Sequence, residues 1–355
     1  LLVYESGTAL KGVIISNMDT TPQYGTPFNI FTGITVKHPS VCYADGDTAF
    51  VACVDDANGA LKATAITTLS GTPTPGALLT GLPSIQYWQP IVRAFASGRV
   101  LLITRDMTNS PNKIRGWVIN DVLTTPAAGS EITGFPNVSA YYLSMIIMES
   151  DKAMVSFDDA SYSAVRAVII SNLSTSPTIG APLVIHGSGT TGDGGRLVYM
   201  GAGKALYVFP SGQSPYYLYF YPLIDLLTSP AIGNQSPSYG GTYSGTSGVH
   251  VVRTGDSSVM ILHRQTISTR VLHRLSNVFG TPSQAADISI PLDVGSYSAM
   301  KVNTGLEPLG IGGSGDGSVL LSFGGSSYLT SQRFSATGVV DSGDRYLAYF
   351  AGAAD

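Results

Sequence analysis

The chain has 355 residues, of which 44% are hydrophobic and only 12% are charged, and its formal net charge at pH 7 is −4. A typical globular domain is about 25% charged, so the sequence has too few Lys and Glu residues for long solvent-exposed helices. Its acidic balance offers no basic surface for nucleic acid, and no apolar run approaches the roughly 18 residues that span a membrane. We therefore expect a β-rich protein that neither binds nucleic acid nor inserts into a membrane.

One pattern returns along the chain, and it is clearest in AVIISNLSTSPTIG at 167–180. An apolar run leads to a short polar residue, and a proline and then a glycine follow. The prolines, here called marker prolines, recur every 51 to 53 residues at Pro22, Pro73, Pro126, Pro177, Pro230 and Pro282. The marker glycine stands three residues later in every repeat except the last, which has Ala285. The polar residue stands five positions before each marker proline, at Asn17, Thr68, Asp121, Asn172, Asp225 and Asn277.

This pattern predicts a chain reversal between two antiparallel strands. Short polar side chains bond the backbone in such turns, and Pro and Gly supply the backbone angles that complete them. Repeats of about 40 to 50 residues that hold several strands are typical of propeller blades. At a period near 52, the chain has room for about seven repeats.

Four strand-like runs fit within one repeat, as at 196–200, 205–209, 217–224 and near 232–239. Their alternation and their β-branched and aromatic residues predict strands. Tight Gly/Asp turns join the first two strands of successive repeats, at 44–47, 97–98, 150–151, 202–203, 255–256 and 316–317. The third strand is apolar on both sides at 13–16 and 167–171, so we expect it to be covered on both faces by stacked sheets.

On these features the sequence resembles the seven-bladed β-propeller superfamily over essentially the whole chain. The resemblance implies an all-β protein in which residues 1–355 form a single domain of seven four-stranded antiparallel blades. It is a resemblance of architecture, because the WD40, kelch and sialidase repeat signatures are absent from the sequence.

Two local questions stay open at this level. The chain begins with a strand of the second type at 1–6, and the segment 345–352 resembles a first strand. That segment could pair with the N-terminal strand and close the ring, or it could be the fourth strand of the last repeat. Cys42 and Cys53 flank a predicted hairpin and could form a disulfide or remain two buried thiols.

The strand order divides the loops between two faces. Short Gly and Pro turns fall on one face, and the second-to-third and blade-to-blade loops, which are longer and richer in aromatic residues, fall on the other. Function usually sits on such loops. The candidate ligand-binding residues there are Asp55, Tyr87, Trp88, Arg105, Asp106, Tyr141, Tyr142, Asp158, Tyr216 and Tyr243. Aromatic faces with a few polar groups suit a sugar or a peptide, although the aromatic residues could instead pack between blades.

A cation recurs eleven residues before the marker proline, as Lys11, Lys62, Arg115 and Arg166. One interpretation is a repeated contact with an anion or a sugar acid. The other is an ion pair with a carboxylate such as Asp55 or Asp158, with the aliphatic stem of the cation packed between blades.

The five histidines show no metal-ligand spacing, so we expect no metal and no other cofactor. We expect a non-enzymatic recognition protein that binds a glycan or a cell-surface receptor through the long-loop face. The composition resembles secreted lectins and bacteriophage tail or fibre proteins, which implies an extracellular or virion-surface location. Two alternatives remain, a polysaccharide hydrolase or lyase and a structural module that docks onto other subunits of an assembly. An enzyme should gather carboxylates near the axis, whereas a lectin should show equivalent shallow pockets.

Overall fold

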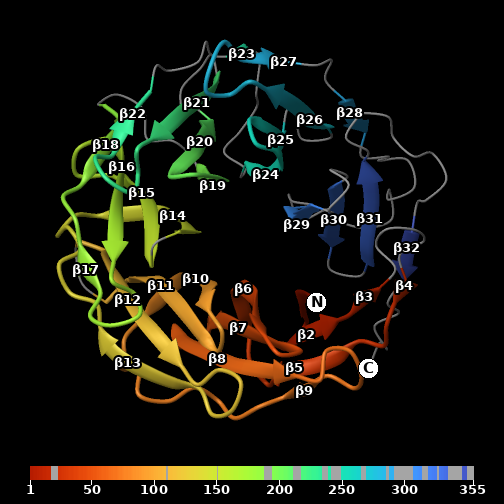
Figure 1. The fold of residues 1–355 in the computed structure, drawn as a ribbon. Helices are drawn as coiled ribbons and strands as arrows, with labels where there is room; N and C mark the ends of the chain where they lie inside the picture. The colour runs from red at the N-terminus through yellow and green to blue at the C-terminus, as the bar shows by residue number, and fades with distance from the viewer. Residues whose placement is uncertain are drawn as a thin grey trace. The chain divides into compact units, whose positions relative to one another are not determined.

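The structure is a computed structural model. It describes residues 1–16, 23–108, 111–149, 151–187, 194–210, 217–233, 239–240, 249–264, 269–284, 288–291, 307–313, 319–325, 328–334 and 346–349. All regular elements in these ranges are β-strands (Figure 1). No helix in the described ranges is long and apolar enough to cross a membrane.

The chain divides into two compact units, and the first comprises 1–16 and 23–189. Its strands are β1 (Leu2–Ser6), β2 (Ala9–Val13), β3 (Ile15–Ser16), β4 (Gln23–Tyr24), β5 (Phe28–Thr32), β6 (Val36–Asp45), β7 (Thr48–Asp55), β8 (Ala60–Thr67), β9 (Thr74–Pro75), β10 (Tyr87–Ala96), β11 (Arg99–Asp106), β12 (Lys113–Asn120), β13 (Ala127–Glu131), β14 (Ala140–Met148), β15 (Lys152–Asp159), β16 (Ala164–Ser171), β17 (Thr178–Ile179) and β18 (Leu183–His186).

The second unit comprises 17–22 and 190–355. Its strands are β19 (Arg196–Gly201), β20 (Lys204–Pro210), β21 (Tyr217–Ile224), β22 (Ala231–Ile232), β23 (Tyr239–Gly240), β24 (His250–Gly255), β25 (Ser258–Arg264), β26 (Thr269–Ser276), β27 (Ser283–Gln284), β28 (Ile288–Pro291), β29 (Glu307–Gly313), β30 (Val319–Gly325), β31 (Tyr328–Phe334) and β32 (Tyr346–Tyr349).

The strands form antiparallel sheets in which sequence neighbours pair. Four-stranded orders recur as β6-β7-β8-β9, β10-β11-β12-β13 and β29-β30-β31-β32, and three further sheets add a fifth short strand to this plan. The first sheet has the order β1-β2-β5, and a separate pair, β3-β4, lies between β2 and β5 in the sequence. The fold is therefore all-β and propeller-like, as the sequence pattern predicts.

The predicted turn between third and fourth strands is present, and its structure explains the polar residue before the marker proline. Thr68, Asp121, Asn172, Asp225 and Asn277 all adopt a left-handed backbone, with φ between 54° and 60°. Asn and Asp tolerate this conformation better than other residues with a Cβ atom. The residue after each of these is apolar, and its N–H donates to a carbonyl in the hairpin between the first two strands. Val122, for example, donates to the Gly98 carbonyl. The two kinds of turn therefore lie at the same end of each sheet.

The marker glycine has a different role from the one expected. The left-handed angle belongs to the Asn or Asp residue, and the marker glycine instead follows the turn with its N–H bonded to the third strand, as in Gly76 to the Ala65 carbonyl. A Cβ atom on Gly129 would lie 3.1 Å from the Val118 carbonyl oxygen, and one on Gly76 would lie 3.3 Å from that of Ala65. Close approach of two backbones therefore favours glycine at these two positions.

The core lies in layers between neighbouring sheets of the same unit. Phe50, Val92 and Trp117 belong to one layer between the sheets that contain β6 and β10, and Leu101, Met145 and Phe157 belong to the next. The strand covered on both faces along its whole length is the second one, β7, in which all eight residues are buried. The third strands are buried mainly in their middle. The apolar residues on both sides of the third strand predicted that both of its faces would be covered. The structure shows that burial of both faces is most complete in the second strand, β7.

Both open questions are answered within the described ranges. β32 pairs with β31, from Tyr328 opposite Tyr349 to Ser331 opposite Tyr346, so the 346–349 segment is a fourth strand. The two cysteines are free, because Cys42 lies opposite Phe50 and Cys53 lies opposite Lys62. Burial raises the pKa of both thiols to about 12.

Candidate functional site

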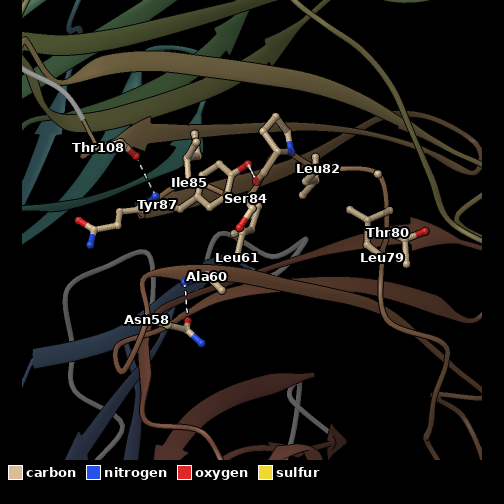
Figure 2. A pocket seen from close by; sticks show the side chains of 13 residues that line it. Asn58, Ala60, Leu61, Leu79, Thr80, Leu82, Ser84, Ile85, Tyr87 and Thr108 are labelled. Carbon is tan, nitrogen blue, oxygen red and sulfur yellow. Dashed lines mark hydrogen bonds between the residues drawn. The ribbon is translucent and has the colours of Figure 1, made fainter.

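A pocket of about 570 Å³ lies between the sheets that contain β8 and β10, at the end opposite the marker prolines. One side is formed by Asn58, Ala60 and Leu61, where the loop after β7 enters β8. The other side is formed by the 79–87 segment, which passes into β10, together with Thr108. Figure 2 shows these two sides, with Asn58 and Ala60 across from the segment that carries Leu82 and Ile85. The lining combines aliphatic side chains with the hydroxyls and amides of Asn58, Thr80, Ser84, Gln86 and Thr108, and none of its described residues is charged.

Backbone hydrogen bonds fix the walls of this pocket. The Tyr87 N–H donates to the Gly59 carbonyl and the Leu79 N–H donates to the Ala63 carbonyl, each at 2.8 Å. The Gln86 N–H donates to the Thr108 hydroxyl at 3.0 Å, which joins the segment entering β10 to the loop that follows β11 in the same sheet. A pocket held by backbone bonds is preformed, and a preformed pocket lowers the entropic cost of binding.

An equivalent pocket of about 300 Å³ lies 53 residues later along the chain. Ile114, Ile132, Thr133 and Pro136 take the places of Leu61, Leu79, Thr80 and Pro83. The wall bonds repeat as well, since Ala140 donates to the Asn112 carbonyl and Ile132 donates to the Gly116 carbonyl. The loop-to-loop bond returns between the Ser139 N–H and the Ser161 hydroxyl at 3.3 Å. This second pocket is smaller, and the charged side chains Lys113, Arg115 and Glu131 line it.

The carboxylates at the ends of the second strands hold the loops beside these pockets. Asp55, Asp106 and Asp159 stand at equivalent positions, and one oxygen of each accepts the N–H two residues later, from Ala57, Thr108 and Ser161. The period of 51 and 53 residues is visible in the sequence and could have identified Asp159 in place of its neighbour Asp158.

The recurring cation pairs with this carboxylate in two repeats. Arg115 bonds to Asp106 and to Glu131, each at 2.8 Å. Arg166 lies 3.2 Å from Asp159 and over the ring of Tyr162. The ion-pair interpretation is therefore confirmed for these two arginines, with Asp106 and Asp159 as the partners. The carboxylate partner of Arg166 is Asp159, the neighbour of the Asp158 named from the sequence, and the pairing of Asp55 stays a prediction.

The predicted aromatic residues lie in strands, which corrects their assignment to loops. Tyr87 and Trp88 begin β10, and Tyr141 and Tyr142 lie at the start of β14. Tyr87 is only 2% exposed; its hydroxyl donates to the Pro83 carbonyl at 2.6 Å and its ring contacts Trp117. Burial raises the pKa of Tyr87 to about 12. Tyr87 thus packs between sheets while it also lines the pocket.

A row of side chains connects the starts of the first strands. The Trp88 ring meets the His38 ring at 4.3 Å, and the Lys37 amino group lies 5.3 Å from its centre. Trp88 stands opposite Arg105, whose guanidinium lies 4.3 Å from the Tyr141 ring centre. Asp158 is buried and stands opposite Tyr141. Tyr216 and Tyr243 fall outside the described residues.

A bulge recurs at the start of the first strands and sequence reasoning missed it. The pairing register shifts after Lys37, Trp88 and Tyr141. The next residues, His38, Gln89 and Tyr142, have φ of 52°, 51° and 48°. Bulges at the rims of sheets re-aim side chains, and left-handed residues other than Gly persist only where the surroundings hold them. Pro39 and Pro90, which follow two of these residues, were the available signal, because proline is tolerated at bulges.

Groups of three or more potential metal ligands are absent from the described part of the chain.

Of the residues predicted from the sequence, the structure brings together Trp88, Arg105 and Tyr141 in one row. Asp55 and Asp106 instead accept backbone N–H groups in turns at the edge of the pockets.

The sequence matches no protein-family model and no curated protein. Its structure is similar to the BP39L lectin from Burkholderia pseudomallei, with 11% identity, a TM-score of 0.66, and 97% of this chain and 94% of that chain covered. It is similar to a protein of Bacteroides fragilis proposed to be a 6-phosphogluconolactonase, with 13% identity, a TM-score of 0.64 and coverage of 99% and 94%. AofleA from Arthrobotrys oligospora is also similar, with 11% identity, a TM-score of 0.57 and coverage of 96% and 90%. At these identities the likeness shows the fold alone, and the chain has the all-β, propeller-like fold of these proteins.

Proposed function

We propose that this protein is a carbohydrate-binding protein whose pocket between β8 and β10 holds an uncharged sugar unit. The observation that carries the proposal is the repetition of one pocket plan at an offset of 53 residues, with the same hydrogen bonds in its walls. Repeated shallow sites around a scaffold suit the repeated units of a glycan, because several weak contacts add through multivalency.

The chemistry of the first pocket supports a sugar as the ligand. Leu61, Leu82 and Ile85 offer apolar surface for the C–H face of a pyranose ring, and hydroxyl and amide groups of the lining can bond its hydroxyls. The absence of charge from the described lining favours a neutral unit over an acidic one. The second pocket is smaller, has the charged Arg115–Glu131 pair in its lining, and should prefer a different unit.

The similarity in fold to a lectin supports carbohydrate binding. The similarity to a proposed lactonase supports an enzyme as the alternative function. Hydrolysis of a glycoside needs two carboxyl groups on opposite sides of the scissile bond. Asp55, Asp106 and Asp159 are instead engaged in loop turns, and two of them also in ion pairs. This engagement favours a binding role for the loop end of the sheets.

We also propose that residues 1–355 form one domain of seven repeats, in which β3-β4 completes the first repeat. The regular marker prolines support this count. A glycan-binding role suggests an extracellular or virion-surface location and a cell-surface glycan as the partner. Labelling of intact cells or virions of the source with an antibody against the chain tests that location.

A glycan-array screen on the purified chain tests the central proposal. Binding to a set of glycans that share one terminal or internal neutral unit is the expected result. Release of reducing ends from a bound polysaccharide would favour the enzyme instead. Failure to bind any glycan would contradict the carbohydrate-binding function.

A further inference from the structure

Arg105 is a buried cation that takes part in none of the ion pairs seen among the described residues. Its side chain is 4% exposed, and its guanidinium lies over Tyr141 and donates to the Met107 sulfur at 3.0 Å. Its Nε atom is buried and has no partner. Thioether sulfur is a weak acceptor, and a buried charge without an opposite charge is costly. The arginines at the third-strand starts, Arg115 and Arg166, both have carboxylate partners, so Arg105 needs a separate explanation.

Two more unpartnered polar atoms lie on the recurring bulges. The Nε2 atom of His38 and the Oε1 atom of Gln89 are buried and make no hydrogen bond. Both residues hold the left-handed conformation at equivalent positions of neighbouring first strands. Most buried polar atoms in proteins find a partner, so three such atoms near Trp88 indicate a site whose partner comes from elsewhere.

The site contains the cations Lys37 and Arg105, and the acids Asp56 and Glu5 lie near Lys37. The pKa of His38 is lowered to about 4, mainly by burial and also by the nearby charges of Lys37 and Arg105, while Asp56 opposes them. Lys37 pairs with Asp56 at 2.8 Å. Glu5 on β1 is the other acid near Lys37; burial raises the pKa of Glu5 and Lys37 lowers it. Among the ion pairs of the described residues, Lys37, Arg115, Arg166 and Arg253 each have a carboxylate partner, and Arg105 takes part in none of these pairs.

We propose that Lys37, His38, Gln89 and Arg105, here called the basic cluster, bind a small oxyanion. The ligand is the carboxylate of an acidic sugar or a phosphate group, because a guanidinium fork matches either one. The anion displaces the Met107 sulfur from Arg105 and accepts from its nitrogen atoms, while the Gln89 amide can turn its N–H₂ toward the ligand. This site is separate from the proposed sugar pocket and takes a ligand of different charge.

An NMR titration of the histidine side chains of the wild-type chain tests the proposal directly. The signal of His38 is assigned with His38→Asn, because Asn tolerates the left-handed backbone. Sodium galacturonate, sodium phosphate and uncharged galactose are added in separate arms at constant ionic strength. A bound anion should raise the pKa of His38 by about one pH unit or more, since it offsets the charges of Lys37 and Arg105. The arm that does so identifies the source of the oxyanion.

Matched arginine variants separate binding from packing. Arg105→Met should weaken anion binding at least tenfold and leave the melting temperature close to that of wild type, because it removes a buried charge that takes part in none of these ion pairs. Arg166→Met, which removes the partner of buried Asp159, should lower the melting temperature and leave anion affinity unchanged. The proposal is wrong if neither anion moves the His38 pKa in the wild type, or if Arg105→Met binds the anion as tightly as wild type. If either of these two results is found while neutral glycans still bind, the anion-site proposal fails and the carbohydrate-binding function stands.

Discussion

The guanidinium of Arg115 bonds to Asp106 at 2.8 Å, while the other oxygen of that carboxylate accepts the Thr108 N–H at 2.9 Å. Asp106 therefore joins the end of the second strand, the start of the third and the loop between them. Burial alone would raise the pKa of Asp106, but the bonds from Thr108 and Arg115 together hold its pKa below the usual value.

The first prediction concerns Arg115→Met, which leaves Asp106 buried without its cation. We expect a loss of about 1 to 3 kcal/mol in the free energy of unfolding at pH 7. Because the pKa of Asp106 is depressed in the fold, its contribution is present above the unfolded pKa of about 3.9 and is lost as pH falls through the folded value. Urea unfolding at pH 7 and pH 3 measures this; equal losses at both pH values would contradict the role of the carboxylate charge.

The second prediction concerns Thr68, the one β-branched residue among the left-handed turn residues of the described repeats. Thr68→Asn should stabilise the protein by about 1 kcal/mol, because Asn adopts this conformation with less steric cost. The reverse change at the equivalent position, Asn172→Thr, should destabilise it by a similar amount. Thermal unfolding of both variants provides the check, and a less stable Thr68→Asn protein would contradict the turn assignment.

The third prediction follows from the low pKa of His38, about 4. The unfolded chain binds a proton near pH 6.5 and the folded chain resists it, so stability should fall as pH drops from 6.5 toward 4. The loss reaches about 3 kcal/mol at most. In His38→Asn the unfolding free energy should depend less on pH over this window. His186, whose pKa burial also lowers, contributes equally to both proteins, and identical pH profiles would show that His38 is not held neutral.

The fourth prediction tests the place of β32. Thr330 and Leu347 lie opposite each other in the register of β31 and β32. Cysteines at these two positions should form a disulfide readily, while the pair at Thr330 and Ala348, shifted by one residue and aimed at opposite faces, should not. Buried Cys42 and Cys53 should react slowly under the same conditions. Cross-linking in both pairs or in neither would argue against this register.

The repeat plan was predictable because its signals are local and periodic. Asn172 and Pro177 mark a turn through their own backbone preferences, and the spacing of such turns indicates how many strands each repeat can hold. The same reasoning found the recurring cations, although it named Asp158 where Asp159 is the partner of Arg166. A shift of one position along a strand moves a side chain to the other face of the sheet and so changes its neighbours. The amino-acid composition does not determine this pairing register.

The candidate site was harder to predict for a physical reason. Tyr87 and Trp88 have the aromatic character of ligand contacts, but their roles depend on neighbours from other sheets, such as Trp117 and His38. The pocket itself is built largely from backbone bonds and aliphatic residues such as Leu82, which carry no chemical signature. The bulge at Gln89 likewise arises from the pairing of two strands.

The measurement that tests the central claim most directly is the affinity and stoichiometry of a neutral glycan, selected on the array, for wild type and for pocket-filling variants. Thr80 and Thr133 occupy equivalent, exposed positions in the two pockets. Thr80→Trp should abolish binding of a neutral unit at the first pocket, Thr133→Trp should affect only the second, and neither should lower the melting temperature by more than a few degrees. Calorimetric titration that shows the expected loss of one site in Thr80→Trp would support the account. Unchanged stoichiometry and affinity in the Thr80→Trp, Thr133→Trp double variant would contradict it.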